Sequence, residues 1–325
     1  MVRLFIALMV ALTVTTMRPA LANPAFALPA ACVLGEDCFV QNYVDMDATT
    51  GAADFSCGGL TYDGHKGTDI RLKNYVVMEQ GVDVLAAAPG TVLRFRDGMD
   101  DVSVRDIGLE AVKDRMAGNS VIVDHGDGWV TQYAHMKKGS IVVTPGQAIA
   151  AGDKLGQIGL SGNTEFPHLH FEVRHNDQPM DPFTDEEMGA GCGIAKQALW
   201  QQTLAYQATG LLNMGFATEK PEADSARHGA YATTAVTGES AALVFWVDFF
   251  GLQAGDKVVQ QLVGPDGNVV AESGKPAAKS KVQFFSFVGK KRPTGGWPSG
   301  SYRGVIRVLR DDKAVIDQTM DFQLP

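Results

Sequence analysis

The hydrophobic and polar positions over residues 83–183 form short β-prone runs that are interrupted by glycine, proline and aspartate. The segment DVLAAAPGTVLRF predicts two strands on either side of a turn at Pro89-Gly90. The segment NSVIVDHGDGWVTQYAHM predicts a hairpin around Gly126-Asp127-Gly128. This pattern is typical of an all-β domain with tight turns.

The pattern changes after Cys192. Over IAKQALWQQTLAYQATGLLNMGF, leucine, alanine and tyrosine recur at helical spacing, so residues 196–229 are expected to form a helix followed by a polar linker. From residue 230 onward, about seven β-prone runs are separated by turn sequences, which predicts an immunoglobulin-like β-sandwich over residues 230–325. The chain is therefore expected to be mainly β, with a first domain over residues 23–195.

The first 22 residues differ from the rest. Arg3 precedes the apolar run LFIALMVALTV, and Ala20-Leu21-Ala22 follows in the small-x-small pattern of a cleavage site, so residues 1–22 predict a signal peptide. A retained anchor is the alternative, but the apolar run is shorter than the ~20 residues that a membrane span needs. The mature protein is therefore expected to be periplasmic or secreted, with no membrane span.

The net charge of the chain limits the classes of binding partner that are expected. Removal of residues 1–22 deletes Arg3 and Arg18 but no acidic residue, which lowers the formal net charge from −9 to −11. Nucleic-acid binding depends on clustered lysine and arginine that neutralise phosphates. Nucleic acid is therefore not expected as a partner, and the sequence identifies no protein partner.

The four cysteines, Cys32, Cys38, Cys57 and Cys192, all follow the predicted signal peptide. An even number of cysteines in an oxidising compartment predicts two disulfides, for which three pairings are possible. We favour Cys32–Cys38 as a small local loop together with Cys57–Cys192. A thiolate zinc site is the alternative, but the chain lacks the close CxxC spacing of such sites.

Two histidines lie two residues apart in the β-prone octapeptide PHLHFEVR, residues 167–174. Successive side chains of a strand point to opposite faces, so His168 and His170 are expected on one face and the apolar residues between them on the other. The segment YDGHKGTDI supplies further candidate ligands in His65 and Asp69, with Gly67 expected to let the backbone turn between them. Two imidazoles and one carboxylate would leave an open coordination position, which is the pattern of a catalytic zinc site.

With H-x-x-x-D, a later H-x-H and YAHM between them, the chain resembles the lysostaphin-type (LytM-like) zinc endopeptidases that cut peptidoglycan cross-links. The resemblance covers roughly residues 56–185 and implies a lysostaphin-type β-sheet catalytic domain. It implies that the metal ligands are His65, Asp69 and His170. It also implies that His135 and His168 are the catalytic residues, without saying which of them is the base.

Two details depart from the family pattern. Met136 stands where leucine is commoner, and TEFPHLHF is less rich in glycine just before the second motif. Neither change removes a reacting group, but the second could reshape the substrate groove.

The function expected from these features is that of an exported, zinc-dependent endopeptidase that hydrolyses peptide cross-links of bacterial peptidoglycan by metal-activated water. The main alternative is a non-catalytic, wall-binding regulator of amidases with the same fold, which the complete set of ligands and catalytic histidines argues against. A lipoyl- or biotinyl-type carrier domain is a second alternative, suggested by the nearly regular spacing of glycines in VTPGQAIAAGDKLGQIG. The bond that is cut stays open between D-alanyl cross-links and glycine bridges.

Overall fold

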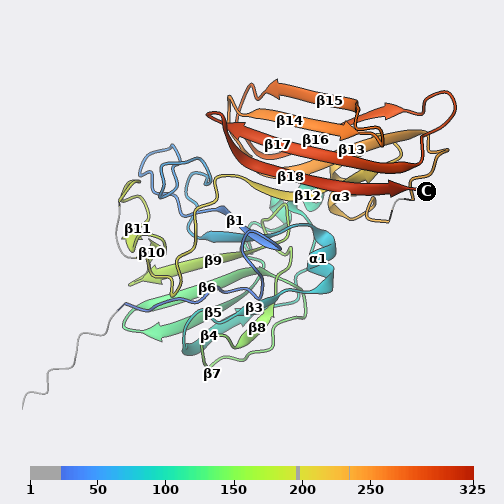
Figure 1. Ribbon diagram of the computed structural model, residues 1–325. Coiled ribbons are helices and arrows are strands. Elements are labelled where there is room, and N and C mark those ends of the chain that lie inside the picture. Colours follow the sequence, from blue (N-terminus) through green and yellow to red (C-terminus); the bar gives the residue numbers. More distant parts are fainter. Residues whose placement is uncertain (1–22, 195–197, 234) are drawn as a thin grey trace, which may run out of the picture.

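The computed structural model describes residues 23–194, 198–233 and 235–325, and the predicted signal peptide lies outside this part of the chain. The described chain is mainly β and is built from one large sheet, a two-stranded sheet beside it, and two smaller sheets that stack against each other (Figure 1). Within the described ranges, no helix has the length and apolar character that crossing a bilayer requires.

The large sheet contains nine strands and carries the residues of the predicted site. Its main path runs in the order β1-β2-β9-β6-β5-β4-β7, and β10 and β11 extend it beside β9. The strands are β1 (Cys38–Asn42), β2 (Thr68–Leu72), β4 (Gly90–Arg96), β5 (Asn119–Gly126), β6 (Trp129–Met136), β7 (Ala148–Ile149), β9 (His168–His175), β10 (Gln178–Asp181) and β11 (Glu186–Glu187).

A small separate sheet and three short helical segments accompany the large sheet. The small sheet pairs β3 (Asp83–Leu85) with β8 (Lys154–Gln157). The helical segments are α1 (Tyr75–Gln80), α2 (Val104–Ile107) and a 3₁₀ turn over Leu109–Ala111. The expected hairpin is confirmed, because β5 and β6 pair antiparallel across residues 126–129.

Strand β9 follows the predicted alternation. Leu169, Phe171 and Val173 are fully buried in the core of the large sheet. His168 and His170 therefore lie on the opposite face. Both are in register with residues of β2, and His170 also pairs with Ala134 of β6. One face of the sheet thus packs in the core, and the other face carries the predicted site residues.

Two further sheets follow in the chain and face each other across a second core. One has the order β12-β13-β16 and the other β15-β14-β17-β18. Their strands are β12 (Gly210–Ala217), β13 (Ala242–Leu252), β14 (Lys257–Val263), β15 (Val269–Pro276), β16 (Lys281–Lys291), β17 (Gly300–Arg310) and β18 (Lys313–Leu324). Phe245 of β13 and Ile306 of β17 meet in their shared core, and the immunoglobulin-like assignment of this region stays a prediction.

The helix expected within residues 196–229 is wrong. Residues 195–197 lie outside the described chain, residues 201–209 form no regular element, and Gly210–Ala217 is strand β12. Here antiparallel pairing with β13 overrides the helical spacing of the apolar residues. The expected linker contains only the five-residue helix α3 (Ala223–Arg227).

Both favoured disulfides are present. Cys32 is bonded to Cys38, and Cys57 to Cys192, a pair separated by 135 residues in the sequence. A cross-link over so long a loop restricts the unfolded chain strongly and stabilises the folded one.

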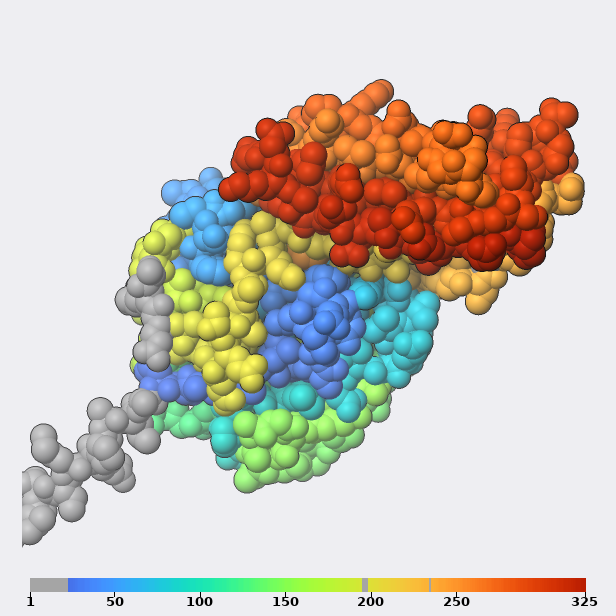
Figure 2. All heavy atoms as spheres, viewed as in Figure 1, coloured from blue at the N-terminus to red at the C-terminus, as the bar shows by residue number. Residues whose placement is uncertain are grey.

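The smaller sheets rest directly on the large one, close to its β1 and α1 side (Figure 2). Phe250 of β13 packs on Phe39 of β1, with ring centroids 5.7 Å apart, and belongs to the core of the large sheet. His228 stacks on Tyr75 of α1 at 3.9 Å. The polar linker therefore does not separate the two parts of the chain.

Candidate metal centre

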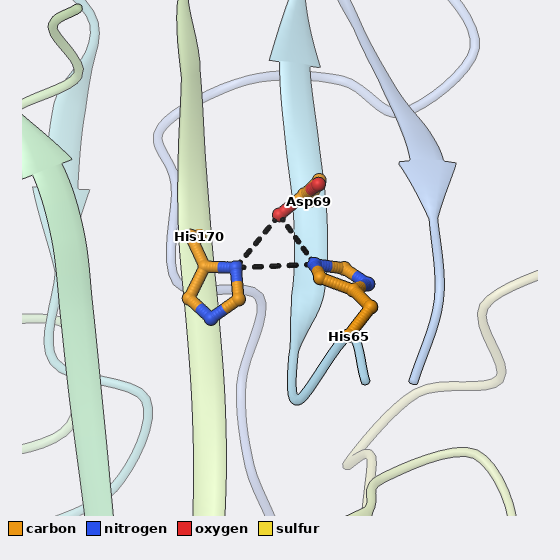
Figure 3. A group of neighbouring side chains, drawn as sticks. All are labelled: His65, Asp69 and His170. Atoms are coloured by element: carbon orange, nitrogen blue, oxygen red, sulfur yellow. Dashed lines mark hydrogen bonds and ion pairs between the residues drawn. The ribbon is translucent and has the colours of Figure 1, made fainter. Parts of the chain in front are cut away.

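Three side chains from two distant parts of the sequence converge on one point of the sheet face opposite Leu169 and Phe171 (Figure 3). Asp69 lies on β2, His170 lies opposite it on β9, and His65 lies in the loop before β2. Asp69 Oδ1 is 3.2 Å from His65 Nε2 and 2.9 Å from His170 Nδ1, and the two nitrogens are 3.2 Å apart. The structure thus brings together all three predicted ligands.

Surrounding groups fix which atoms face the centre. The backbone carbonyl of Tyr43 accepts a hydrogen bond from His65 Nδ1 at 2.7 Å, which leaves Nε2 free to act as a ligand. Asn42 Nδ2 donates to Asp69 Oδ2 at 2.9 Å, which leaves Oδ1 free. Asn42 lies on β1, and no sequence motif pointed to it.

The donor set fits a zinc ion in chemistry and in size. Two imidazoles and a carboxylate are common zinc ligands, and tetrahedral coordination at ~2.0–2.2 Å separates neighbouring donor atoms by ~3.3–3.6 Å. The observed separations of 2.9–3.2 Å are only a few tenths of an ångström shorter. Three lone-pair atoms held this close favour a shared proton or a cation between them.

The electrostatics of these three side chains agree with a site for a cation. Burial by itself would raise the pKa of Asp69, but the neighbouring histidines, His65 foremost, hold this pKa well below its usual value. Burial by itself would lower the pKa of His170, but its contacts with Asp69 and Glu172 raise it to about 9. A metal ion would therefore displace a proton from His170 on binding.

Gly67 has a different role from the one expected. It does not adopt a positive φ angle, so it is not needed for a turn. Instead, a Cβ atom at this position would lie 2.7 Å from His170 Cε1 and Nε2 and 2.8 Å from the carbonyl oxygen of Phe171. Only glycine allows the backbone before β2 to pass this close to His170.

The two predicted catalytic histidines flank the three candidate ligands. The ring centroids of His135 and His168 are 4.7 Å apart, and His135 lies 5.9 Å from His170. His168 Nε2 is 3.4 Å from Asp69 Oδ1. All five predicted site residues therefore form one largely buried cluster on this face of the sheet.

His135 reaches this cluster through an unusual backbone conformation. Its φ angle is +60°, in the left-handed region, at the bulged end of β6. His135 Nδ1 is held by the carbonyl of Ser161 at 2.7 Å, so its Nε2 is the free nitrogen. Burial, together with the nearby His168 and His170, lowers the pKa of His135 well below its usual value, so that the ring is neutral at pH 7.

His168 is oriented in a similar way by groups that precede it in the chain. Its Nδ1 lies 3.0 Å from the carbonyl of Phe166 and 3.1 Å from Thr164 Oγ1. Thr164 and Phe166 belong to TEFPHLHF, the stretch that departs from the family pattern. This departure therefore lies in contact with a predicted catalytic residue.

The remaining histidines lie outside the cluster. His125 bridges the carbonyl of Pro89 and the hydroxyl of Thr131. His175 stacks on Trp129, and His228 packs on α1 as described above. As expected, they have no place in the predicted site.

A mainly β domain that gathers two imidazoles, a carboxylate and two further histidines in one cluster has the features of a metallopeptidase. Residues 63–182 match the model of peptidase family M23. This match confirms the expected resemblance to the lysostaphin-type enzymes over residues 63–182 of the 325-residue chain.

Curated relatives are similar over part of the same region. The cell division protein DipM of Caulobacter vibrioides is 39% identical over 71 residues, which is 20% of this chain and 11% of DipM. The peptidoglycan DD-endopeptidases ShyB and ShyA of Vibrio cholerae are 35% and 37% identical, over 28% and 20% of this chain. The matches span only 20% of ShyB and 15% of ShyA.

Among solved structures, a zinc-containing peptidase from Vibrio cholerae is 23% identical, with a TM-score of 0.29. The match covers 49% of this chain and 41% of that one.

Proposed function

We propose that this protein is a zinc-dependent endopeptidase that hydrolyses peptide cross-links of bacterial peptidoglycan in the periplasm or outside the cell. The observation that carries the proposal is the convergence of His65 Nε2, Asp69 Oδ1 and His170 Nδ1 within 3.2 Å of one another. Peptidoglycan as the substrate is supported by the names of the relatives ShyB and ShyA.

In this proposal His65, Asp69 and His170 hold the metal. When bound, zinc lowers the pKa of a coordinated water toward ~7 and polarises a carbonyl group. Asn42 and the Tyr43 carbonyl keep two of the ligands oriented through hydrogen bonds of 2.9 and 2.7 Å. Such supporting contacts raise metal affinity because less order has to be created on binding.

His135 and His168 carry the proton transfer and the stabilisation of the oxyanion between them. Each ring uses Nδ1 to bind a backbone carbonyl, Ser161 for His135 and Phe166 for His168, so each directs Nε2 away from that anchor. A neutral imidazole can accept the proton of the attacking water and return it to the leaving amine. The other imidazole, as an N–H donor, can stabilise the negative oxygen of the tetrahedral intermediate.

The test is incubation of the purified, zinc-loaded protein with a defined cross-linked muropeptide dimer, followed by mass spectrometry of the products. We expect two monomers whose combined mass exceeds that of the dimer by one water. The matched control is His65→Ala, which lacks a ligand and should leave the dimer intact. A wild-type protein that binds the dimer without cutting it would overturn the proposal in favour of the regulatory alternative.

A further inference from the structure

Arg71 is a buried arginine beside the proposed active site. It lies two residues after Asp69 on β2, so both side chains point to the same face of the sheet. In the pairing of β2 with β9 it is directly opposite His168, as Asp69 is opposite His170. Side chains paired in this way have Cβ atoms about 5 Å apart.

The charge of Arg71 has no carboxylate partner. Its side chain is 2% exposed, yet among the described residues no acidic group lies within ion-pair distance of its guanidinium. Gln41 Oε1 accepts a hydrogen bond from one terminal nitrogen, and Nε has no partner. Asp248, the carboxylate that favours the charged form of Arg71 from a distance, is already bound by Arg227 at 2.8 and 3.1 Å.

An unpaired buried charge is unfavourable, so its retention calls for an explanation. An arginine side chain keeps its positive charge at neutral pH even where it is buried. A purely structural role at this position needs only a neutral side chain, such as an amide, that donates a hydrogen bond to Gln41. The cation therefore points to an anionic group that the isolated protein lacks.

Phe166 lies over this cation. Its ring centroid lies 4.4 Å from Arg71 Cζ and 4.8 Å from the ring of His168. The ring is only partly buried and sits on the loop that precedes β9. A rotation of this one side chain would open a path from His168 to the guanidinium.

We propose that Arg71 is a specificity-determining residue that binds a free carboxylate of the substrate next to the scissile bond, with Phe166 giving way to admit it. The inference rests on the proposed function and narrows its substrate class. A D-alanyl cross-link to diaminopimelate has a free carboxylate on the carbon that bears the scissile nitrogen. A glycine bridge has no such group, so the inference favours the former.

The experiment compares two cross-linked dimers that differ only in this group, one with the free carboxylate and one with the same carboxylate amidated. Bonds from a charged donor to a carboxylate are the strong ones, so we expect kcat/KM of the wild type to be about 10- to 100-fold higher for the free acid. Arg71→Gln should abolish the preference, mainly through KM, and leave the zinc content unchanged. Arg71→Lys should keep part of the preference, because it keeps the charge without the planar fork.

The ratio of the two rates on one protein sample does not depend on the fraction that has folded, so partial misfolding of a variant does not hide the result. Arg94→Gln is the matched control, because Arg94 is an exposed arginine on β4, four positions from β2 in the sheet. Equal wild-type rates on both dimers, or an Arg71→Gln variant that loses both rates equally, would overturn the role of Arg71. A wild type that cuts neither dimer would instead contradict the proposed function itself.

Discussion

Replacement of Gly67 by alanine tests how tightly the backbone before β2 determines the metal site. The added Cβ would lie 2.7 Å from two ring atoms of His170, whereas ordinary contact begins at 3.4 Å, so the ring must retreat by about 0.7 Å. Retreat in the other direction is limited, because the carbonyl of Phe171 is 2.8 Å from the same Cβ and belongs to the paired strand β9. Zinc ligand distances tolerate deviations of only about 0.2 Å.

We therefore expect Gly67→Ala to lose at least 10- to 100-fold in zinc affinity, on the scale seen when groups that support a ligand are removed. Competition with a chromophoric chelator measures the affinity, and circular dichroism checks the fold. Gly59→Ala is the control, because Gly59 has no positive φ and a Cβ there meets no atom within 4 Å. Wild-type zinc affinity in Gly67→Ala would refute the reasoning that close approach, and not chain flexibility, requires this glycine.

Three further expectations follow from the geometry. His170→Ala should lose both zinc binding and cleavage, whereas His168→Ala should keep zinc near one per chain and lose about 10²–10³-fold in turnover. Elemental analysis measures the zinc content, and cleavage of a muropeptide measures the turnover. Loss of zinc in both variants would contradict the assigned roles. Phe250→Ala should lower the free energy of unfolding by about 3–5 kcal/mol, because this ring fills the core shared with Phe39. A urea midpoint equal to that of the wild type would contradict this expectation and show that the smaller sheets dock loosely. In protein without bound zinc, the pKa of His135 is lowered in the folded state, so His135 binds a proton near pH 6.5 only in the unfolded state. This difference lowers the free energy of unfolding as the pH drops from 7 to 5. His135→Gln should reduce this loss of stability at low pH. The same pH dependence of stability in the wild type and the variant would contradict the role of His135.

Several features could be predicted because their causes are local. Strand β9 was readable from its alternation, since apolar side chains two residues apart must share the buried face. The β5–β6 hairpin was readable from its glycine-rich turn, and the disulfide pairing from the even cysteine number and the positions of the four residues.

Strand β12 shows how the same reasoning failed. Its apolar residues fit a helical period, but the segment is held as a strand by its pairing with β13. Gly215 lies so close beneath Trp246 that a Cβ would come within 2.7 Å of the indole, and Gly210 is similarly close to Phe250. A contact with residues some 30 to 40 positions later in the chain leaves no periodic signal.

By itself, then, the sequence determined the identity of the chemical groups: the histidines and aspartate of the two motifs, the cysteines, and the strand that carries His168 and His170. The tertiary structure decided which atoms meet. The left-handed φ of His135 turns its ring toward the cluster. Asn42, which precedes Asp69 by 27 residues and lies on the edge strand β1, donates a hydrogen bond to Asp69. Arg71 is covered by Phe166, from the loop before β9. The physical reason is that periodicity and spacing describe neighbours along the backbone, whereas orientation, burial and charge at a site are set by groups brought together only when the sheets pair and pack.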